Sequence, residues 1–591
     1  MPVGRLLGYD LRFTRDAGGP PVTLAELVPL EGPDAIAYAG LGHPSFFIGR
    51  PAPRLACLHG SCRMLHGKDE DALVLGDLVV ARNAADLSVR PSALYLTGDQ
   101  IYADDVAGPL ALWIRKLAPL LAGDDEPTSV PGLPAVNEIP LYERGPVVSA
   151  CARLTSDEPY NHLVTFGEMA AMYTVSWNPE MWPAAWEPPP GHLSLRRRQR
   201  YQKDVVNLES ARAGITPVRR LLANVPTYTM FDDHDVTDDW NLTREWKREV
   251  HATAAGRRII ANALASYWAF QGWGNDPRAY PAPFKRSLEA HLSRGGRGTG
   301  ESYEQTLWSF DKWAYCAPTT PVTLALDTRT RRGYDDDRSP SRLVPRAELE
   351  DLTRLLAGAG YEPGDPLIVI SAVPVFGFEV REQTHRMLIR VLGPYHLDLE
   401  GWRSNLRGFT DFMVWLCSEV KPSYCVFLSG DVHYAFNIEG SFRCDDREVR
   451  VVQLTSSPQK NTGLFQKVGV ALLGRIVRKR DERLGWNVPP RPTRRKLWAR
   501  VKMQLAFAGE GMPLFLTHKD AEKIGVAGQS HYRERRVYVR PSGPTSSFIV
   551  GSNNLGFALI TPDRVVHRLA SPRGGRGVLY TAAMHLEDRD G

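Results

Sequence analysis

Three short acidic segments of this chain each follow a run of apolar residues. They are residues 98–102 (Gly-Asp-Gln-Ile-Tyr), 232–235 (Asp-Asp-His-Asp) and 430–433 (Gly-Asp-Val-His). Their carboxylate, phenol and imidazole groups are donors that metal cations bind in proteins. Carboxylates crowded around a histidine would also repel one another and raise each other's pKa values unless cations compensate. The three segments therefore predict a metal centre.

The spacing within the segments supports this prediction. Asp431 and His433 lie two residues apart, so on an extended loop both side chains point to one side and can serve one centre of two metals. The alternative is structural, because carboxylates after strands are also common helix caps and turn formers. We favour the metal reading because three such segments occur together.

Cys62 is a further candidate ligand, in the segment 60–63 (Gly-Ser-Cys-Arg). The adjacent Arg63 and a nearby cation could hold it as a thiolate. A thiolate together with a phenolate favours iron(III), whereas the carboxylates suit calcium, magnesium or manganese. Taken alone, a single cysteine is more often a buried small apolar residue.

Buried strands are expected to position these segments. Apolar runs at residues 93–97, 227–231 and 424–428 lead directly into them, and two similar runs occupy residues 322–326 and 367–373. Apolar residues at helical spacing predict helices over residues 252–268 and 409–420. Strands and helices alternate imperfectly along the chain, which indicates an α/β or α+β sheet enzyme, and we favour the α/β class.

The 591 residues are too many for one ordinary core, so we expect one large domain with additions. The pattern predicts a small β-rich N-terminal segment and a catalytic domain that contains a largely helical insertion. The N-terminal segment is residues 1–50, and the catalytic domain is residues 51–460, with the helical insertion at 106–225. A basic insertion at 461–540 and a C-terminal part of the catalytic domain at 541–591 complete the chain.

Residues 467–502 form the strongest basic patch, with apolar residues interleaved. Such a run is usually a solvated face, but contact with an anionic membrane or polyphosphate is an alternative. The formal net charge of +5 gives no reason to expect a specific nucleic acid partner, and the oligomeric state is not predicted. Neither a signal peptide nor a spanning apolar segment is recognisable, so we expect a cytoplasmic location.

Taken together, the motifs resemble the PhoD-like (alkaline phosphatase D) family of the calcineurin-like metallophosphoesterase superfamily. The resemblance covers residues 51–460 discontinuously and includes the order and wide separation of the motifs. The motifs that carry it are Gly-Ser-Cys-Arg at 60–63, Leu-Thr-Gly-Asp-Gln-Ile-Tyr-Ala-Asp at 96–104, Phe-Asp-Asp-His-Asp at 231–235, Leu-Asp-Thr-Arg at 326–329 and Leu-Ser-Gly-Asp-Val-His at 428–433.

The resemblance implies a four-layer α/β/β/α sandwich with a binuclear metal centre of Fe3+ plus Ca2+, with Mn2+, Mg2+ and Zn2+ as alternatives. Asp99 would bridge the two metals. The ligands of the first metal would be Cys62, Asp99, Tyr102 and His433. Asp233 and Asp431 would join Asp99 on the second metal.

The implied reaction is in-line attack by a metal-bound hydroxide on a phosphate ester. His234 would contact the phosphate and assist the leaving group, while Arg63 and Arg329 could bind phosphate oxygens in a bidentate manner. We therefore expect a phosphatase or phosphodiesterase. The alternatives are a phosphodiesterase directed at phospholipids or polymers, and a non-catalytic protein that binds anionic surfaces through the basic insertion.

Overall fold

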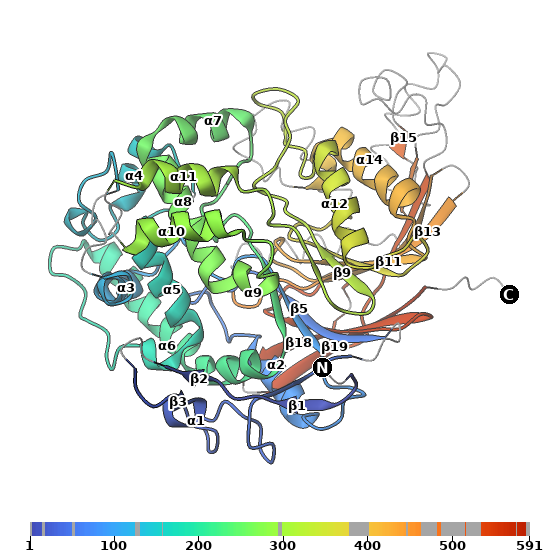
Figure 1. Cartoon of the computed structure of the whole chain (residues 1–591), viewed down its shortest axis with the longest axis horizontal. Coiled ribbons are helices and arrows are strands. Elements are labelled where there is room, and N and C mark those ends of the chain that lie inside the picture. The colour runs from blue at the N-terminus through green and yellow to red at the C-terminus, as the bar shows by residue number, and fades with distance from the viewer. Residues whose placement is uncertain are drawn as a thin grey trace.

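The computed structural model contains two large β-sheets and a group of helices at one side of them (Figure 1). It describes residues 3–14, 18–49, 54–123, 130–156, 158–293, 298–377, 401–444, 447–461, 482–485, 514–515, 533–545, 547–574 and 576–586.

The six-stranded sheet has the strand order β19-β18-β17-β5-β6-β7. Its strands β5, β6 and β7 are parallel, and β17 runs antiparallel to β5. All five side chains of β6 are buried, as expected for an apolar run in the middle of a sheet. The strands are β5 (Leu55–Gly60), β6 (Ala93–Thr97), β7 (Thr227–Met230), β17 (Leu555–Ile560), β18 (Arg564–Arg573) and β19 (Arg576–His585).

The nine-stranded sheet has the order β15-β14-β16-β12-β13-β11-β10-β9-β8. Its centre is parallel, with β10 and β11 in register from Leu367 opposite Cys425 to Ser371 opposite Ser429. The strands are β8 (Tyr315–Ala317), β9 (Val322–Ala325), β10 (Leu367–Ser371), β11 (Tyr424–Ser429), β12 (Phe436–Cys444), β13 (Arg447–Thr455), β14 (Glu482–Gly485), β15 (Leu514–Phe515) and β16 (Arg533–Tyr538).

Apolar side chains of the two sheets meet in a shared core. Tyr95 of β6 and Val426 of β11 belong to the same buried cluster. A second cluster joins the nine-stranded sheet to α12 (Arg346–Gly358) and α14 (Leu406–Trp415), and a third joins the six-stranded sheet to α2 (Val74–Arg82) and α6 (Leu195–Asn224). The two sheets therefore pack against each other, and helices cover their other faces.

The remaining helices pack around a core of their own beside the sheets (Figure 1). One of them, α5, has Thr165 as its N-cap, and the Thr165 side chain accepts the Glu168 N–H in a capping box. The helices are α3 (Gly108–Ala122), α4 (Arg144–Ala152), α5 (Phe166–Trp177), α7 (Arg244–Ala252), α8 (Ala254–Tyr267), α10 (Ala282–Ser293) and α11 (Gly300–Ser309). The short helix α9 (Trp273–Asn275) contacts β7 instead. Short 3-10 turns cover Val136–Glu138, Pro179–Met181 and Trp402–Ser404, and π-helical turns cover Trp268–Gly272 and Leu416–Val420.

The N-terminal segment contains two small sheets and one short helix. β1 (Leu6–Gly8) pairs with β4 (Ser45–Phe47), and β2 (Arg12–Phe13) pairs with β3 (Val22–Thr23) just before α1 (Leu24–Leu27).

The α/β class and the five predicted strand runs are confirmed. The domain boundaries and the named α/β/β/α order stay predictions. Most of the basic segment 467–502 lies outside the described residues, which include only 482–485 of it. Among the described residues, none of the helices has the length and apolar character needed to cross a membrane.

Candidate metal centre

Four strand ends position three of the predicted ligands together with Asp232, the neighbour of the predicted ligand Asp233. Cys62, Asp99, Asp232 and Asp431 each lie two residues beyond the last residue of β5, β6, β7 and β11, respectively. The strands β5, β6 and β7 are mutually parallel, so their carboxyl ends lie at one edge of their sheet. Loops at the carboxyl ends of parallel strands are the usual place for a site in an α/β protein.

The carboxylates of these loops form a tight cluster. One oxygen from each of Asp99, Asp232, Asp233 and Asp431 can be chosen so that all four lie within 4.8 Å of one another. Burial, followed by the charge of Asp232, raises the pKa of Asp99 well above its usual range. Asp99 Oδ1 is buried without a hydrogen-bond partner in the described structure. A hard cation would satisfy that oxygen and relieve the repulsion, so these residues fit a metal.

Cys62 lies at the edge of this cluster. Its Sγ is 3.3 Å from Asp99 Oδ2, and the Ser61 and Ser457 hydroxyls are each 3.3 Å from the same sulfur. Burial, and then the charges of Asp99 and Asp431, raise the pKa of the Cys62 thiol. A bound cation would oppose these effects and favour the thiolate. The structure thus brings Cys62 to the predicted ligands, and it adds Ser457, which its sequence context does not reveal.

Tyr102 and His433 meet at Asn461. The Asn461 Nδ2 atom donates to Tyr102 Oη at 2.9 Å and lies 3.4 Å from His433 Nε2. Burial, followed by the charges of Cys62 and Asp99, raises the pKa of Tyr102. Asn461 begins the predicted basic insertion, and no sequence motif marks it as part of a site.

His234 forms a pair with Asp104. Its Nδ1 is 3.0 Å from each Asp104 carboxylate oxygen, and its ring stacks on Tyr102 at 4.4 Å between centroids. Burial alone would lower the pKa of His234, but the charges of Asp104 and Asp233 raise it well above its usual range. Burial alone would raise the pKa of Asp104, but His234 holds it below its usual range. The contacts with Asp104 therefore favour the imidazolium form of His234. The His234 side chain is 23% exposed.

Asp238 also belongs to this end of the centre. It forms a second group with Asp233 and His234 whose ligand atoms all lie within 4.8 Å of one another. Burial raises the pKa of Asp238 to about 8. Asp104 ends the motif at 96–104, but the sequence assigned it no role. Asp238 lies outside every motif, where acidic residues are too common to indicate a site.

The two predicted phosphate-binding arginines are buried and engaged with other groups. Arg63 Nε pairs with Asp71 at 2.7 Å, and its Nη1 donates to the Ser176 carbonyl at 2.9 Å. The Arg329 guanidinium contacts Asp232 and lies 3.1 Å from Asp233 Oδ1. Bidentate phosphate binding stays a prediction for both arginines. These contacts instead favour a structural role for Arg63 and a charge-neutralising role for Arg329.

Several predicted ligands adopt left-handed backbone conformations. The φ angles are +58° at Cys62, +53° at Asp99, +61° at Asp431 and +56° at His433. Such angles are uncommon outside glycine, and at functional sites the surrounding structure holds them in place. Their concentration in the loops after β5, β6 and β11 supports a functional origin for this edge of the sheets.

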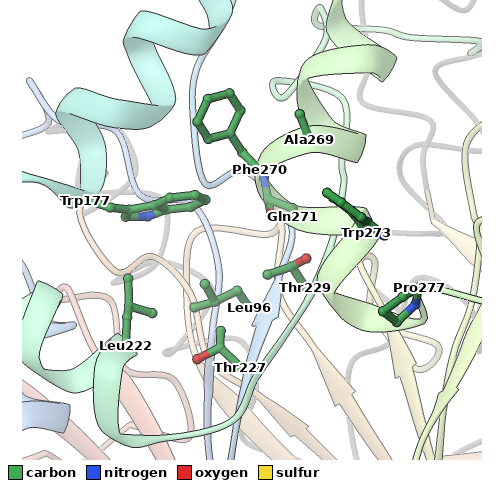
Figure 2. Close-up of a pocket in the computed structure, with 11 residues that line it drawn as sticks. Leu96, Trp177, Leu222, Thr227, Thr229, Ala269, Phe270, Gln271, Trp273 and Pro277 are labelled. Carbon is green, nitrogen blue, oxygen red and sulfur yellow. The ribbon is translucent and has the colours of Figure 1, made fainter. Parts of the chain in front are cut away.

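A cavity of about 500 Å³ lies beside β6 and β7, away from these groups (Figure 2). Trp177, Phe270 and Trp273 line it together with Leu96 and Leu222. No histidine, cysteine or carboxylate lines it, so the chemistry predicted from the sequence lies elsewhere.

No protein-family model matches the chain, and a search of curated proteins finds no match. A solved structure titled "Structure of PhoD" is similar with a TM-score of 0.40 and 11% sequence identity, over 92% of this chain and 75% of that chain. A likeness at this level is too weak to assign a fold or a function.

Proposed function

We propose that this protein is a two-metal phosphoesterase that hydrolyses phosphate esters, as a phosphatase or a phosphodiesterase of the PhoD-like kind. The observation that carries the proposal is the cluster of four carboxylates within 4.8 Å of one another. A buried thiol, Cys62, lies directly beside it. Four buried carboxylates this close together need cations to offset their repulsion, and two cations in such a site are suited to phosphoryl transfer.

The proposed ligands divide between two metals. Asp99 would serve both metals, and the remaining ligands would follow the sequence motifs. Cys62, Tyr102 and His433 would join Asp99 in holding the first metal, and their thiolate and phenolate groups suit Fe3+. Asp233 and Asp431 would join it in holding the second metal, and their oxygen atoms suit Ca2+, with Mn2+, Mg2+ and Zn2+ as alternatives. When bound, the two cations would lower the pKa of a water molecule and neutralise charge in the transition state.

The residues around the metals have distinct tasks in this proposal. His234, held by Asp104 as an imidazolium, donates a proton to the oxygen of the leaving group. Arg329 neutralises Asp232 and part of the charge of Asp233, and this leaves other carboxylate oxygens for cations. Ser61 and Ser457 donate hydrogen bonds to the Cys62 sulfur and stabilise its thiolate form.

The proposed fold is the α/β/β/α sandwich of the same superfamily. The core shared by the two sheets and the helices α2, α6, α12 and α14 on their outer faces support it. A preference for phospholipid or polymer substrates would depend on residues 467–502, which lie mostly outside the described residues. We therefore propose no substrate beyond a phosphate ester.

The test is hydrolysis of bis-p-nitrophenyl phosphate and p-nitrophenyl phosphate, each with and without added Ca2+. We expect turnover that depends on the cation and is lost with a chelator. The preferred ester would distinguish a phosphodiesterase from a phosphomonoesterase. No turnover of either ester with Ca2+, Mn2+, Mg2+ or Zn2+ would overturn the proposal.

A further inference from the structure

The Asp235 carboxylate is the acceptor for four backbone N–H groups. Its Oδ2 accepts from Asp99 at 2.9 Å and from Asp232 at 3.0 Å. Its Oδ1 accepts from Gln100 at 3.1 Å and from Ile101 at 3.3 Å. The residue is 1% exposed, so solvent does not compete for these hydrogen bonds.

Three of these donors are successive residues of one loop. Successive N–H groups that point to one side form a nest, which is an arrangement that binds anions. Asp99 begins this nest with a φ of +53°, a conformation that costs free energy and needs support from its surroundings. The Asp235 carboxylate supplies the anion from within the chain, and this supports the left-handed conformation of Asp99.

The fourth donor belongs to a different loop. Asp232 follows β7, whereas residues 99–101 follow β6, so one carboxylate joins the two loops. The loops are also in close contact at Gly98, where a Cβ would lie 2.7 Å from the Asp232 Cβ. The separation of Asp99 and Asp232 therefore depends on a side chain that is not itself part of the carboxylate cluster.

We propose that Asp235 is the positioning residue of the carboxylate cluster, setting the Asp99 loop against the Asp232 loop so that their carboxylates converge. The metal-binding part of this inference rests on the proposed function, whereas the loop-positioning part does not. Because both Asp235 oxygens already accept two N–H groups each, Asp235 acts through Asp99 and Asp232.

The substitutions that test this are Asp235→Asn and Asp235→Glu. Asparagine has nearly the same size, but it loses the charge and turns an NH2 group toward two backbone donors. Glutamate keeps both acceptor oxygens and the charge. The matched control is Asp77→Asn, because Asp77 is an equally buried carboxylate on α2 that pairs with Arg220 at 2.6 Å and with Tyr38 at 3.0 Å.

The first measurement is backbone hydrogen exchange of the metal-free protein at pH 8, followed on peptides that cover residues 98–102 and 231–233. For Asp235→Asn we expect exchange about tenfold faster in both peptides, because their N–H groups lose a charged acceptor. We expect the exchange rates of Asp235→Glu to stay within a few-fold of the wild-type rates, and those of Asp77→Asn to be unchanged in both peptides.

Exchange at the wild-type rate in Asp235→Asn would overturn the proposal. If Asp235→Asn does not fold, Asp235→Glu decides: near-wild-type protection supports the proposal, and loss of protection in both peptides overturns it.

The second measurement is Co2+ binding, followed by its visible absorption spectrum. We expect Asp235→Asn to bind Co2+ about 10- to 100-fold more weakly with an altered spectrum, and Asp235→Glu to restore most of the affinity. Wild-type affinity and spectrum in Asp235→Asn would overturn the metal-binding part. If the wild-type protein does not bind Co2+, the proposed function fails, but the exchange experiment still tests whether Asp235 positions the two loops.

Discussion

Two groups of buried polar side chains can be compared, one inside the six-stranded sheet and one where ends of its strands meet the end of β11, and the cost of burial is offset differently in each. Within the sheet, His59 of β5 and His567 of β18 share a contact of 3.0 Å between their Nε2 atoms. His567 Nδ1 also lies 2.6 Å from Asn437 Oδ1. Burial lowers the pKa of His59 to about 3 and that of His567 well below its usual range, so both rings are neutral.

At the ends of β6, β7 and β11, the two sheets bury charged groups instead. Asp99, Asp232, Asp233 and Asp431 lie together, while Arg329 neutralises one side of the cluster. Neutral polar groups can be buried when they pair with each other, but carboxylates of one sign need cations. The difference indicates that the strand ends are built to bind something positive, whereas the histidine pair is structural.

The largest expected effect comes from Asp99→Asn, which removes charge at the centre of the cluster. Bound metal should be lost and turnover should fall by about 1,000-fold or more, because the bridging ligand is lost. The metal-free protein should become more stable by about 1 kcal/mol, because repulsion decreases. Metal analysis, turnover and urea unfolding test this. Asp77→Asn is the control, since it should reduce stability and leave metal content unchanged. Full metal content in Asp99→Asn would contradict the interpretation of the cluster.

A smaller effect is expected from His234→Ala, which removes a proton donor but none of the proposed ligands. Metal content should be kept while turnover falls by about 100- to 1,000-fold. Asp104→Asn should have a weaker effect of the same kind, because it removes only the partner of the imidazolium. Metal analysis together with steady-state kinetics measures both. His234 would have no separate catalytic role if His234→Ala lost as much metal as Asp99→Asn.

The histidine pair should make the smallest contribution, visible as a pH dependence of stability. His59 has a pKa of about 3 in the folded protein against an ordinary value of 6.5. Because the unfolded chain binds more protons between these values, this contribution is complete above pH 6.5 and is lost as the pH falls toward 3. For His59 alone, stability should fall by about 2 kcal/mol between pH 7 and pH 5.

Urea unfolding at the two pH values measures this change. We expect His59→Gln to lose the dependence, while His43→Gln, at an exposed histidine, should keep it. An equal fall in the wild type and in His59→Gln would show that the pair is not responsible.

The strands and the ligand loops could be predicted from the sequence because both are local patterns. Continuous apolar runs end where acidic motifs begin, and this places Asp99, Asp233 and Asp431 at one edge. The partners of other site residues could not be predicted, because these partners lie far away in the sequence. Asp104 is 130 residues from His234, and Ser457 is 395 residues from Cys62. The buried pairing of Arg63 with Asp71 spans only 8 residues, but the chain between them is irregular, and no local pattern predicts its conformation.

The most direct test of the central claim is elemental analysis of the protein purified without a chelator. We predict iron near one atom per chain, together with a second cation that can be exchanged for Ca2+. In Cys62→Ser the iron content should fall. A wild-type protein that holds no metal and gains none on incubation with Fe3+, Ca2+, Mn2+, Mg2+ or Zn2+ would contradict the account.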